Sequence, residues 1–84
     1  MNYKVFILPR AQKELAALPS PEFESFETKI IALQENPRPA GCKKLKERQG
    51  WRIRAGNHRL IYKIDDAEKT VTVVRVGHRR EIYR

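Results

Sequence analysis

The stretch WRIRAGNHRLIYKI, residues 51–64, decides the fold because it predicts two strands joined by a tight turn. Residues 51–54 alternate between apolar and basic side chains, which places the two kinds on opposite faces of a strand. Gly56 and Asn57 supply the turn, and residues 58–64 continue as a second strand of the same period. The face opposite the apolar one then carries Arg52, Arg54, Arg59, Ile61 and Lys63. This hairpin predicts a sheet with one apolar and one largely basic face.

A third strand is expected after the polar loop at residues 65–69. Residues 70–76 are rich in valine and threonine, which favours a strand, and Gly77 is expected to end it. Three successive strands with short connections predict an antiparallel meander. Residues 78–84 close the chain.

Upstream of the hairpin, the apolar pattern changes from strand to helix. Tyr3–Leu8 is a short apolar run that Pro9 ends, and we expect it to be a first strand buried on both faces. Ala11, Leu15 and Leu18 then recur at the spacing of one helical stripe.

A second helix is expected between two proline breaks, at residues 19–21 and 36–37. Ser20 suits its N-cap, and Pro21 suits its first helical position. Its apolar stripe consists of Phe23, Phe26, Ile30 and Leu33. The short link between the two helices implies an antiparallel helix hairpin packed on something apolar.

The whole chain, residues 1–84, is expected to form one α+β domain of element order βααβββ. Residues 38–50 form an irregular basic connection, with a short extended piece around Leu45. The helix hairpin packs on one face of the antiparallel meander sheet, and the arginines lie on the other face.

Positive charge is concentrated in the second half of the chain. Lysine and arginine total 18 against 10 acidic residues, which gives a net charge of +8. Residues 1–42 hold five of each sign, so the whole excess lies in residues 43–84, with 13 basic and 5 acidic side chains. Such a distribution is typical of a polyanion-binding protein, although a solvated basic surface has the same composition.

The sequence argues against several other classes of site. Cys42 is the one cysteine, so an intramolecular disulfide is excluded, and we interpret it as an incidental thiol. Apolar runs of membrane-spanning or signal-peptide length are absent, which favours the cytoplasm. The two histidines are far apart, and there is neither a carboxylate cluster nor a glycine-rich phosphate loop. We therefore expect neither a metal nor a cofactor.

The arginines form the pattern that could carry chemistry. Arg52 and Arg54 are two residues apart on one strand, about 7 Å between Cα atoms, and Arg59 begins the neighbouring strand. Arg79 and Tyr83 follow Gly77. Guanidinium groups bind phosphate oxygens bidentately, and several of them would stabilise the charge of a pentacovalent transition state.

RNA brings its own nucleophile, the 2′-hydroxyl. Crowded cations would lower the pKa of Tyr83 below its ordinary value. Further contacts to RNA or to the ribosome are expected from Lys43, Lys44, Lys46, Arg48, His78 and Arg80.

Each residue also has a simpler interpretation. Arg52 and Arg54 alone fit a solvated face, Trp51 fits the core better than a base-stacking platform, and Tyr83 fits packing as well as catalysis. Glu47 suits the surface, although a carboxylate near this face could act as a base. The combination of these residues favours the functional interpretation.

The sequence resembles the RelE branch of the RelE/ParE toxin superfamily over essentially its whole length. The segments that carry the resemblance are WRIR at 51–54, NHRLIY at 57–62 and, above all, VGHRREIY at 76–83. The resemblance implies a toxin of a type II toxin–antitoxin pair that enters the ribosomal A site and cleaves mRNA there. The cut would proceed by 2′-hydroxyl attack and leave a 2′,3′-cyclic phosphate, and a cognate antitoxin would wrap the toxin.

By the same resemblance, Tyr83 would be the general base, and Arg79 the general acid or a stabiliser of the leaving oxygen. Arg52, Arg54 and Arg59 would hold the phosphate. The chain departs from the family in having arginine at 52 and 54, where well-known members have lysine. The stretch between Arg79 and Tyr83 is also shorter than in some members.

Two other functions stay open at this point. A ParE-like toxin would have the same fold and inhibit DNA gyrase without cleaving RNA, but it would not need the arginine-and-tyrosine ending. A nucleic-acid-binding module without catalysis is the third interpretation.

Overall fold

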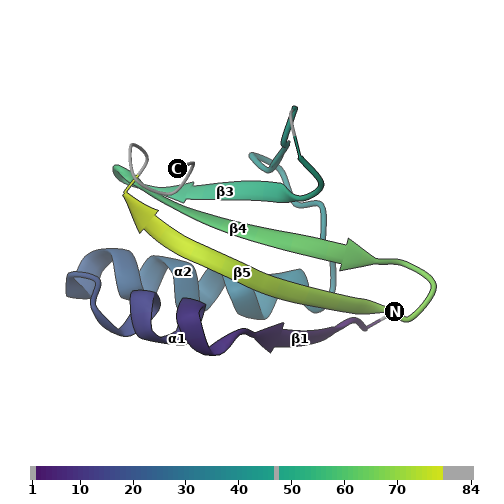
Figure 1. Cartoon of the computed structure of the whole chain (residues 1–84), viewed down its shortest axis with the longest axis horizontal. Helices are drawn as coiled ribbons and strands as arrows, with labels where there is room; N and C mark the ends of the chain where they lie inside the picture. The colour runs from purple at the N-terminus through teal and green to yellow at the C-terminus, as the bar shows by residue number, and fades with distance from the viewer. Residues whose placement is uncertain (1, 47, 79–84) are drawn as a thin grey trace.

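The computed structural model describes residues 2–46 and 48–78. Its elements, in chain order, are β1 Lys4–Ile7, α1 Pro9–Ala16, α2 Ser20–Leu33, β2 Lys43–Lys44, β3 Trp51–Ala55, β4 His58–Asp65 and β5 Thr70–His78. The five strands form one mixed sheet in the order β1-β5-β4-β3-β2 (Figure 1). The structure confirms the α+β class, the two N-terminal helices and the antiparallel meander, which is β3-β4-β5. The extended piece expected around Leu45 is β2, which pairs antiparallel with β3.

The core lies between the helices and one face of the sheet. It combines the predicted helix positions Ala11, Leu15, Phe26, Ile30 and Leu33 with inward-facing positions of β3, β4 and β5. Leu60 and Tyr62 of β4 are fully buried there, and the hydroxyl of Tyr62 donates a hydrogen bond to the carbonyl of Pro37 at 2.8 Å. This bond satisfies the one polar atom that the Tyr62 side chain brings into the core. Trp51 is half-buried and packs against the same cluster, as expected.

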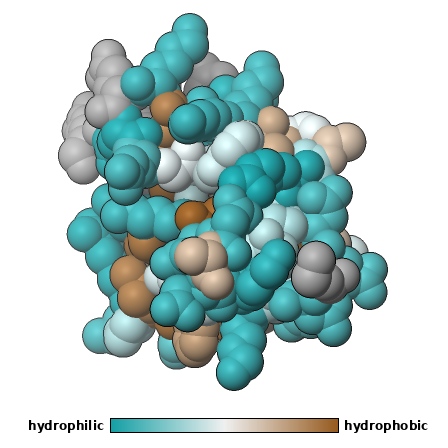
Figure 2. Space-filling view, turned by 90° about the vertical axis from the view of Figure 1, so that its right-hand side faces the viewer, coloured by the Kyte–Doolittle hydropathy of each residue, from teal (hydrophilic) through white to brown (hydrophobic). Residues whose placement is uncertain are grey.

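The prediction that the first strand is buried on both faces is wrong. β1 is an edge strand that pairs in parallel with β5, and helices cover only one face of the sheet. Phe6 is therefore 52% exposed and Leu8 42% exposed. Figure 2, which looks onto the end of the molecule at the right of Figure 1, shows a mostly hydrophilic surface with apolar atoms gathered in its lower left part.

Two predicted boundaries also differ from the structure. Ser20 is the first residue of α2 rather than its N-cap, and the cap position is Pro19, without a side-chain hydrogen bond. Gly77 does not end the last strand, because β5 continues to His78 with Gly77 paired to Arg59.

Of the helices described, none combines the length and the apolar character needed to cross a membrane.

Candidate nucleic-acid interface

Strand register brings the predicted basic residues onto the sheet face that the helices leave uncovered. Lys43 of β2 is the direct partner of Arg52 on β3. Arg54 of β3 is the partner of Arg59 on β4. Directly paired residues project from the same face, so each pair sets two positive charges side by side. Like charges in this arrangement repel, and an anion bound between them would relieve the repulsion.

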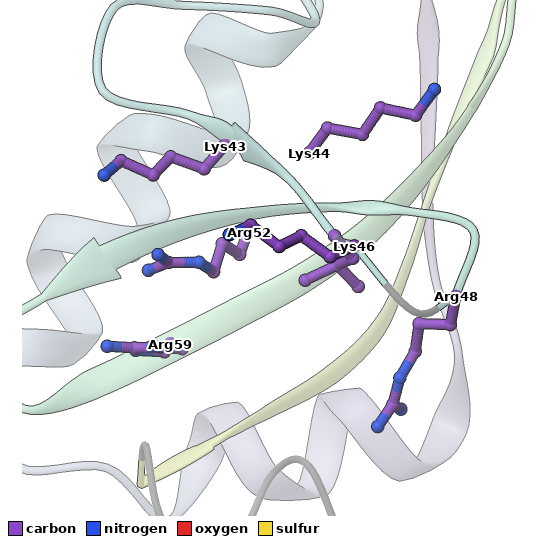
Figure 3. A pocket seen from close by; sticks show the side chains of 7 residues that line it. Lys43, Lys44, Lys46, Arg48, Arg52 and Arg59 are labelled. Carbon is purple, nitrogen blue, oxygen red and sulfur yellow. The ribbon is translucent and has the colours of Figure 1, made fainter.

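Arg52 and Arg59 line a surface hollow of about 500 Å³, which we call the basic hollow. Its other lining residues are Lys43, Lys44, Leu45, Lys46 and Arg48. In Figure 3, the side chains of Arg52 and Arg59 run in the same direction from neighbouring strands, with Lys43 beside them, whereas Lys44 points away from the group. The described residues that line the basic hollow include no carboxylate. The basic hollow therefore has the charge and the shape to receive a polyanion.

Gly50 makes the basic hollow possible because it lets the β2–β3 connection close over the sheet. It is buried, and its φ of +130° lies in a region that other residues rarely adopt. A Cβ atom at this position would lie 3.2 Å from the carbonyl oxygen of Tyr62 and 3.3 Å from Cδ1 of Leu45. The connection also covers Ile61, which is 2% exposed although it alternates with the core residues of β4. Sequence reasoning missed this role, although a glycine directly before a strand is a usable signal.

Arg54 does not line the basic hollow. It borders a separate hollow of about 270 Å³ together with Lys29, Ala32, Pro39, Ala40, Gly41 and Ile53. Its backbone carbonyl accepts a hydrogen bond of 2.8 Å from Nζ of Lys29 on α2. The predicted phosphate-binding set is thus divided, with Arg52 and Arg59 together and Arg54 at a neighbouring edge.

His78 lies on the opposite side of the sheet from Arg59. Its partner across the strands is His58, which lies on the same face of β4 as the core residue Leu60. The two imidazole rings meet edge to face, with centroids 5.9 Å apart and an interplanar angle of 83°.

Four of the predicted residues lie outside the described ranges, namely Glu47, Arg79, Arg80 and Tyr83. Within the described ranges, His, Cys, Asp and Glu side chains form no group of three that could hold a metal ion.

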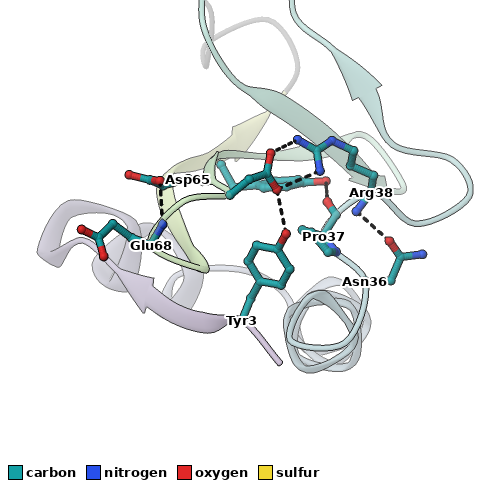
Figure 4. A network of polar contacts seen from close by, with 8 residues as sticks. Tyr3, Asn36, Pro37, Arg38, Asp65 and Glu68 are labelled. Carbon is teal, nitrogen blue, oxygen red and sulfur yellow. Dashed lines mark hydrogen bonds and ion pairs between the residues drawn. The ribbon is translucent and has the colours of Figure 1, made fainter. Parts of the chain in front are cut away.

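A polar network anchors the connection that leads into β2 (Figure 4). The guanidinium of Arg38 donates to the carboxylate of Asp66 at 2.8 and 3.2 Å, and the Tyr3 hydroxyl donates to the same carboxylate at 2.7 Å. These hydrogen bonds lower the pKa of Asp66 to about 2, and the bond to Asp66 raises the pKa of Tyr3. The Arg38 guanidinium also lies 5.2 Å from the ring centroid of Trp51, within cation–π range. The network ties the start of β3 and the turn between β4 and β5 to the segment before β2.

Comparison with known proteins agrees with this architecture. Residues 5–83 match the family model of the ParE toxin of type II toxin–antitoxin systems, parDE. The chain belongs to the RelE/ParE superfamily of type II toxins. It is 35% identical to the toxin RelG of Mycobacterium tuberculosis, and the match spans 100% of this chain and 99% of the relative.

Solved structures of RelE toxins have the same fold as this toxin. The M. tuberculosis RelBE2 toxin–antitoxin complex contains a chain that matches with a TM-score of 0.79 and 29% identity, covering 94% of this chain and 100% of that one. The archaeal RelE–RelB complex from Pyrococcus horikoshii OT3 gives a TM-score of 0.83 at 25% identity, with coverage of 96% and 99%. The isolated Escherichia coli RelE toxin gives 0.77 at 28% identity, with coverage of 90% and 83%.

The Lys43–Arg52 pair predicts that Lys43→Gln stabilises the free toxin. Removing one of two like charges placed opposite each other should raise the free energy of unfolding by about 0.2–1 kcal/mol. Urea unfolding at low salt measures this change. Lys63→Gln is the matched control because Lys63 is exposed and faces Thr72, which carries no charge. A Lys43→Gln protein no more stable than the control would contradict the prediction.

The Asp66 network predicts an acid-dependent loss of stability. The carboxylate has a lower pKa in the folded chain than the roughly 3.9 of an unfolded one, so its contribution is complete above about pH 5 and disappears as the pH falls towards 2. Wild type should therefore be more stable than Asp66→Asn at pH 7, and the difference should close on acidification. Glu68→Gln removes a carboxylate from the same turn and serves as control. A difference that does not vary with pH would refute this account.

Proposed function

We propose that this toxin is a ribosome-dependent endoribonuclease that cleaves mRNA in the A site and thereby inhibits translation in the cytoplasm. The observation that supports the proposal is the basic hollow, in which Arg52 and Arg59 extend side by side from neighbouring strands. Two guanidinium groups on adjacent strands suit one phosphodiester, because each can bind two of its oxygens. The mRNA would lie across β3 and β4 with its backbone in the basic hollow.

The proposed reaction is attack of the 2′-hydroxyl on the adjacent phosphorus, with departure of the 5′-oxygen and formation of a 2′,3′-cyclic phosphate. In this reaction Arg52 and Arg59 stabilise the extra negative charge of the pentacovalent transition state. Arg54 binds a neighbouring part of the backbone, as its place beside the basic hollow suggests. The site as proposed uses the protein's own cations and requires no metal ion.

Proton transfer is assigned to residues beyond His78. Tyr83 takes the proton from the 2′-hydroxyl, and Arg79 donates to the leaving oxygen or stabilises its charge. The sequence resemblance supports these two roles. Glu47 is a second candidate base, since it belongs to the connection that lines the basic hollow. Substituting Tyr83 and Glu47 separately distinguishes the two candidates. Only loss of the residue that acts as the base should abolish the rise of the cleavage rate with pH.

The proposed partners are the ribosome, mRNA and a cognate antitoxin. Lys44, Lys46 and Arg48 line the basic hollow, and together with Arg80 they are proposed to contact mRNA or ribosomal RNA. His78, on the other face of the sheet, is proposed to contact ribosomal RNA. RelE relatives from M. tuberculosis and P. horikoshii were solved as toxin–antitoxin complexes, which supports an antitoxin for this chain. The net charge of +8 favours an acidic segment that folds on binding.

Inhibition of DNA gyrase is the second candidate function. The family model that matches this chain is described as ParE toxin, whereas the similar curated protein is RelG. A gyrase inhibitor would have the same fold and no requirement for paired arginines on the open sheet face. The arrangement of Arg52 and Arg59 is the reason why we favour RNA cleavage.

Primer extension on a defined mRNA tests the proposal. Wild type should produce new ends inside A-site codons when programmed ribosomes are present and none when they are absent. Arg52→Gln, Arg59→Gln, Arg79→Ala and Tyr83→Phe should each lower the cleavage rate by a factor on the order of 10²–10³. Lys13→Gln, which removes an exposed charge on α1, is the control and should cleave normally. Growth arrest with inhibited gyrase and uncut mRNA would favour the ParE-like function instead.

Binding to single-stranded RNA should depend steeply on salt. Each phosphate contact contributes a slope of about −0.7 to log K against log salt concentration. Arg52→Gln should make the slope shallower by one such contact, and Lys13→Gln should leave it unchanged. Fluorescence titration with a labelled oligonucleotide from 50 to 300 mM salt, roughly the range in which such slopes are measured, gives the values. A flat dependence for wild type would exclude phosphate binding as the source of affinity.

A further inference from the structure

The last strand contains one residue too many for regular pairing with β4. Tyr62 pairs with Val73, but Ile61 pairs with Arg75, so Val74 is an inserted residue, a β-bulge. Val71 and Val73 are fully buried in the core, and simple alternation would turn Val76 to the opposite face. Instead Val76 is 1% exposed and also lies in the core. The bulge therefore reverses the faces of every β5 residue that follows it.

This reversal decides what stands beside Arg59. With the bulge, Arg59 is paired with Gly77, which has no side chain. If the pairing of Tyr62 with Val73 continued regularly, Val76 would stand opposite Arg59, and Arg75 would lie opposite the core residue Leu60. The bulge thus places a residue without a side chain opposite an arginine of the basic hollow and keeps a charge out of the core.

Glu14 of α1 contacts the bulge. Its carboxylate accepts the backbone N–H of Val76 at 2.9 Å and the Nε–H of Arg75 at 3.1 Å. The side chains of Glu14 and Arg75 are only 24% and 19% exposed, so water screens this pair less than an exposed one. β1 pairs with β5 only as far as Val73, and beyond that point α1 lies against β5. Glu14 therefore takes the place of a strand partner for Val76.

We propose that Glu14 is a positioning residue for the RNA site. It acts through Arg75 and the Val76 N–H to fix the bulge, and the bulge sets Gly77 opposite Arg59. This inference rests on the proposed RNA cleavage. In this proposal a residue of α1 influences the geometry around Arg59 on the open face of the sheet.

Variants of the two bulge partners test the proposal in the full-length toxin. Glu14→Ala removes both hydrogen bonds, Glu14→Gln keeps an oxygen for the Val76 N–H but loses the ion pair, and Arg75→Gln removes the ion pair from the other side. Glu27→Gln makes the same charge change at an exposed position of α2 and is the control. Amide hydrogen exchange at Val76 and the cross-strand NMR contact between Arg59 and Gly77 report the bulge directly. Cleavage on programmed ribosomes reports its consequence.

We expect Glu14→Ala to lose Val76 protection and the Arg59–Gly77 contact. Its kcat should fall about 10- to 100-fold, because small misplacements of catalytic groups have effects of that size. KM should change less than kcat, because Lys43 and Arg52, which also line the basic hollow, lie on β2 and β3, away from the bulge. Glu14→Gln should be intermediate in both readouts, and Glu27→Gln should match wild type.

Failure of this proposal is distinguishable from failure of the proposed function. A wild-type toxin that never cuts mRNA overturns RNA cleavage, and with it the catalytic consequence assigned to Glu14, while the NMR contact still decides whether Glu14 holds the bulge. If Glu14→Ala keeps both Val76 protection and the Arg59–Gly77 contact, Glu14 does not hold the bulge. If the contact is lost in Glu14→Ala and kcat stays at the wild-type value, the positioning role is refuted.

Discussion

Two-residue alternation along β3 and β4 places Leu60 and Tyr62 in the core and Arg52 and Arg59 on the opposite face of the same strands. Burying one large apolar side chain is worth about 1.5–3 kcal/mol. A pair of like charges opposite each other costs about 0.2–1 kcal/mol. The core therefore outweighs the repulsion, and the sheet can carry closely placed cations that an isolated hairpin could not. Apolar burial on the covered face thus offsets the charge repulsion on the open face.

The basic hollow also depends on departures from regular strand geometry. Gly50 lets the β2–β3 connection approach the sheet with a backbone conformation and a closeness that a side chain would strain. The inserted Val74 changes the faces of β5, so that Gly77 rather than Val76 stands beside Arg59. Both departures are secured from neighbouring elements: the Leu45 N–H donates to the Gly50 carbonyl at 3.0 Å, and Glu14 accepts from Val76. Regular pairing everywhere would have left a flatter and more crowded surface.

The sequence predicts the elements because their periods are clear, and it fails where tertiary contacts decide. Alternation in residues 51–64 and the helical stripes through Leu15 and Phe26 need no distant partner to be recognised. The parallel pairing of β1 with β5 joins residues far apart in the chain, so burial of Phe6 could not be judged locally. The bulge is invisible in a run of valines, because Val73, Val74 and Val76 differ only in their surroundings. Likewise, Arg54 could not be separated from Arg52 before the surroundings of each side chain were known.

The central claim is that RNA binds on the open face of β3 and β4. NMR titration of the toxin with a short single-stranded RNA whose 2′-hydroxyls are methylated tests it most directly, because the substrate cannot be cut. The account predicts that the largest shifts occur at Lys43, Arg52 and Arg59, that α1 and α2 stay unchanged, and that Lys43→Gln weakens binding. Shifts centred on the helices would contradict the account. An absence of shifts at an RNA concentration of about 1 mM, which corresponds to binding weaker than a millimolar Kd, would also contradict it.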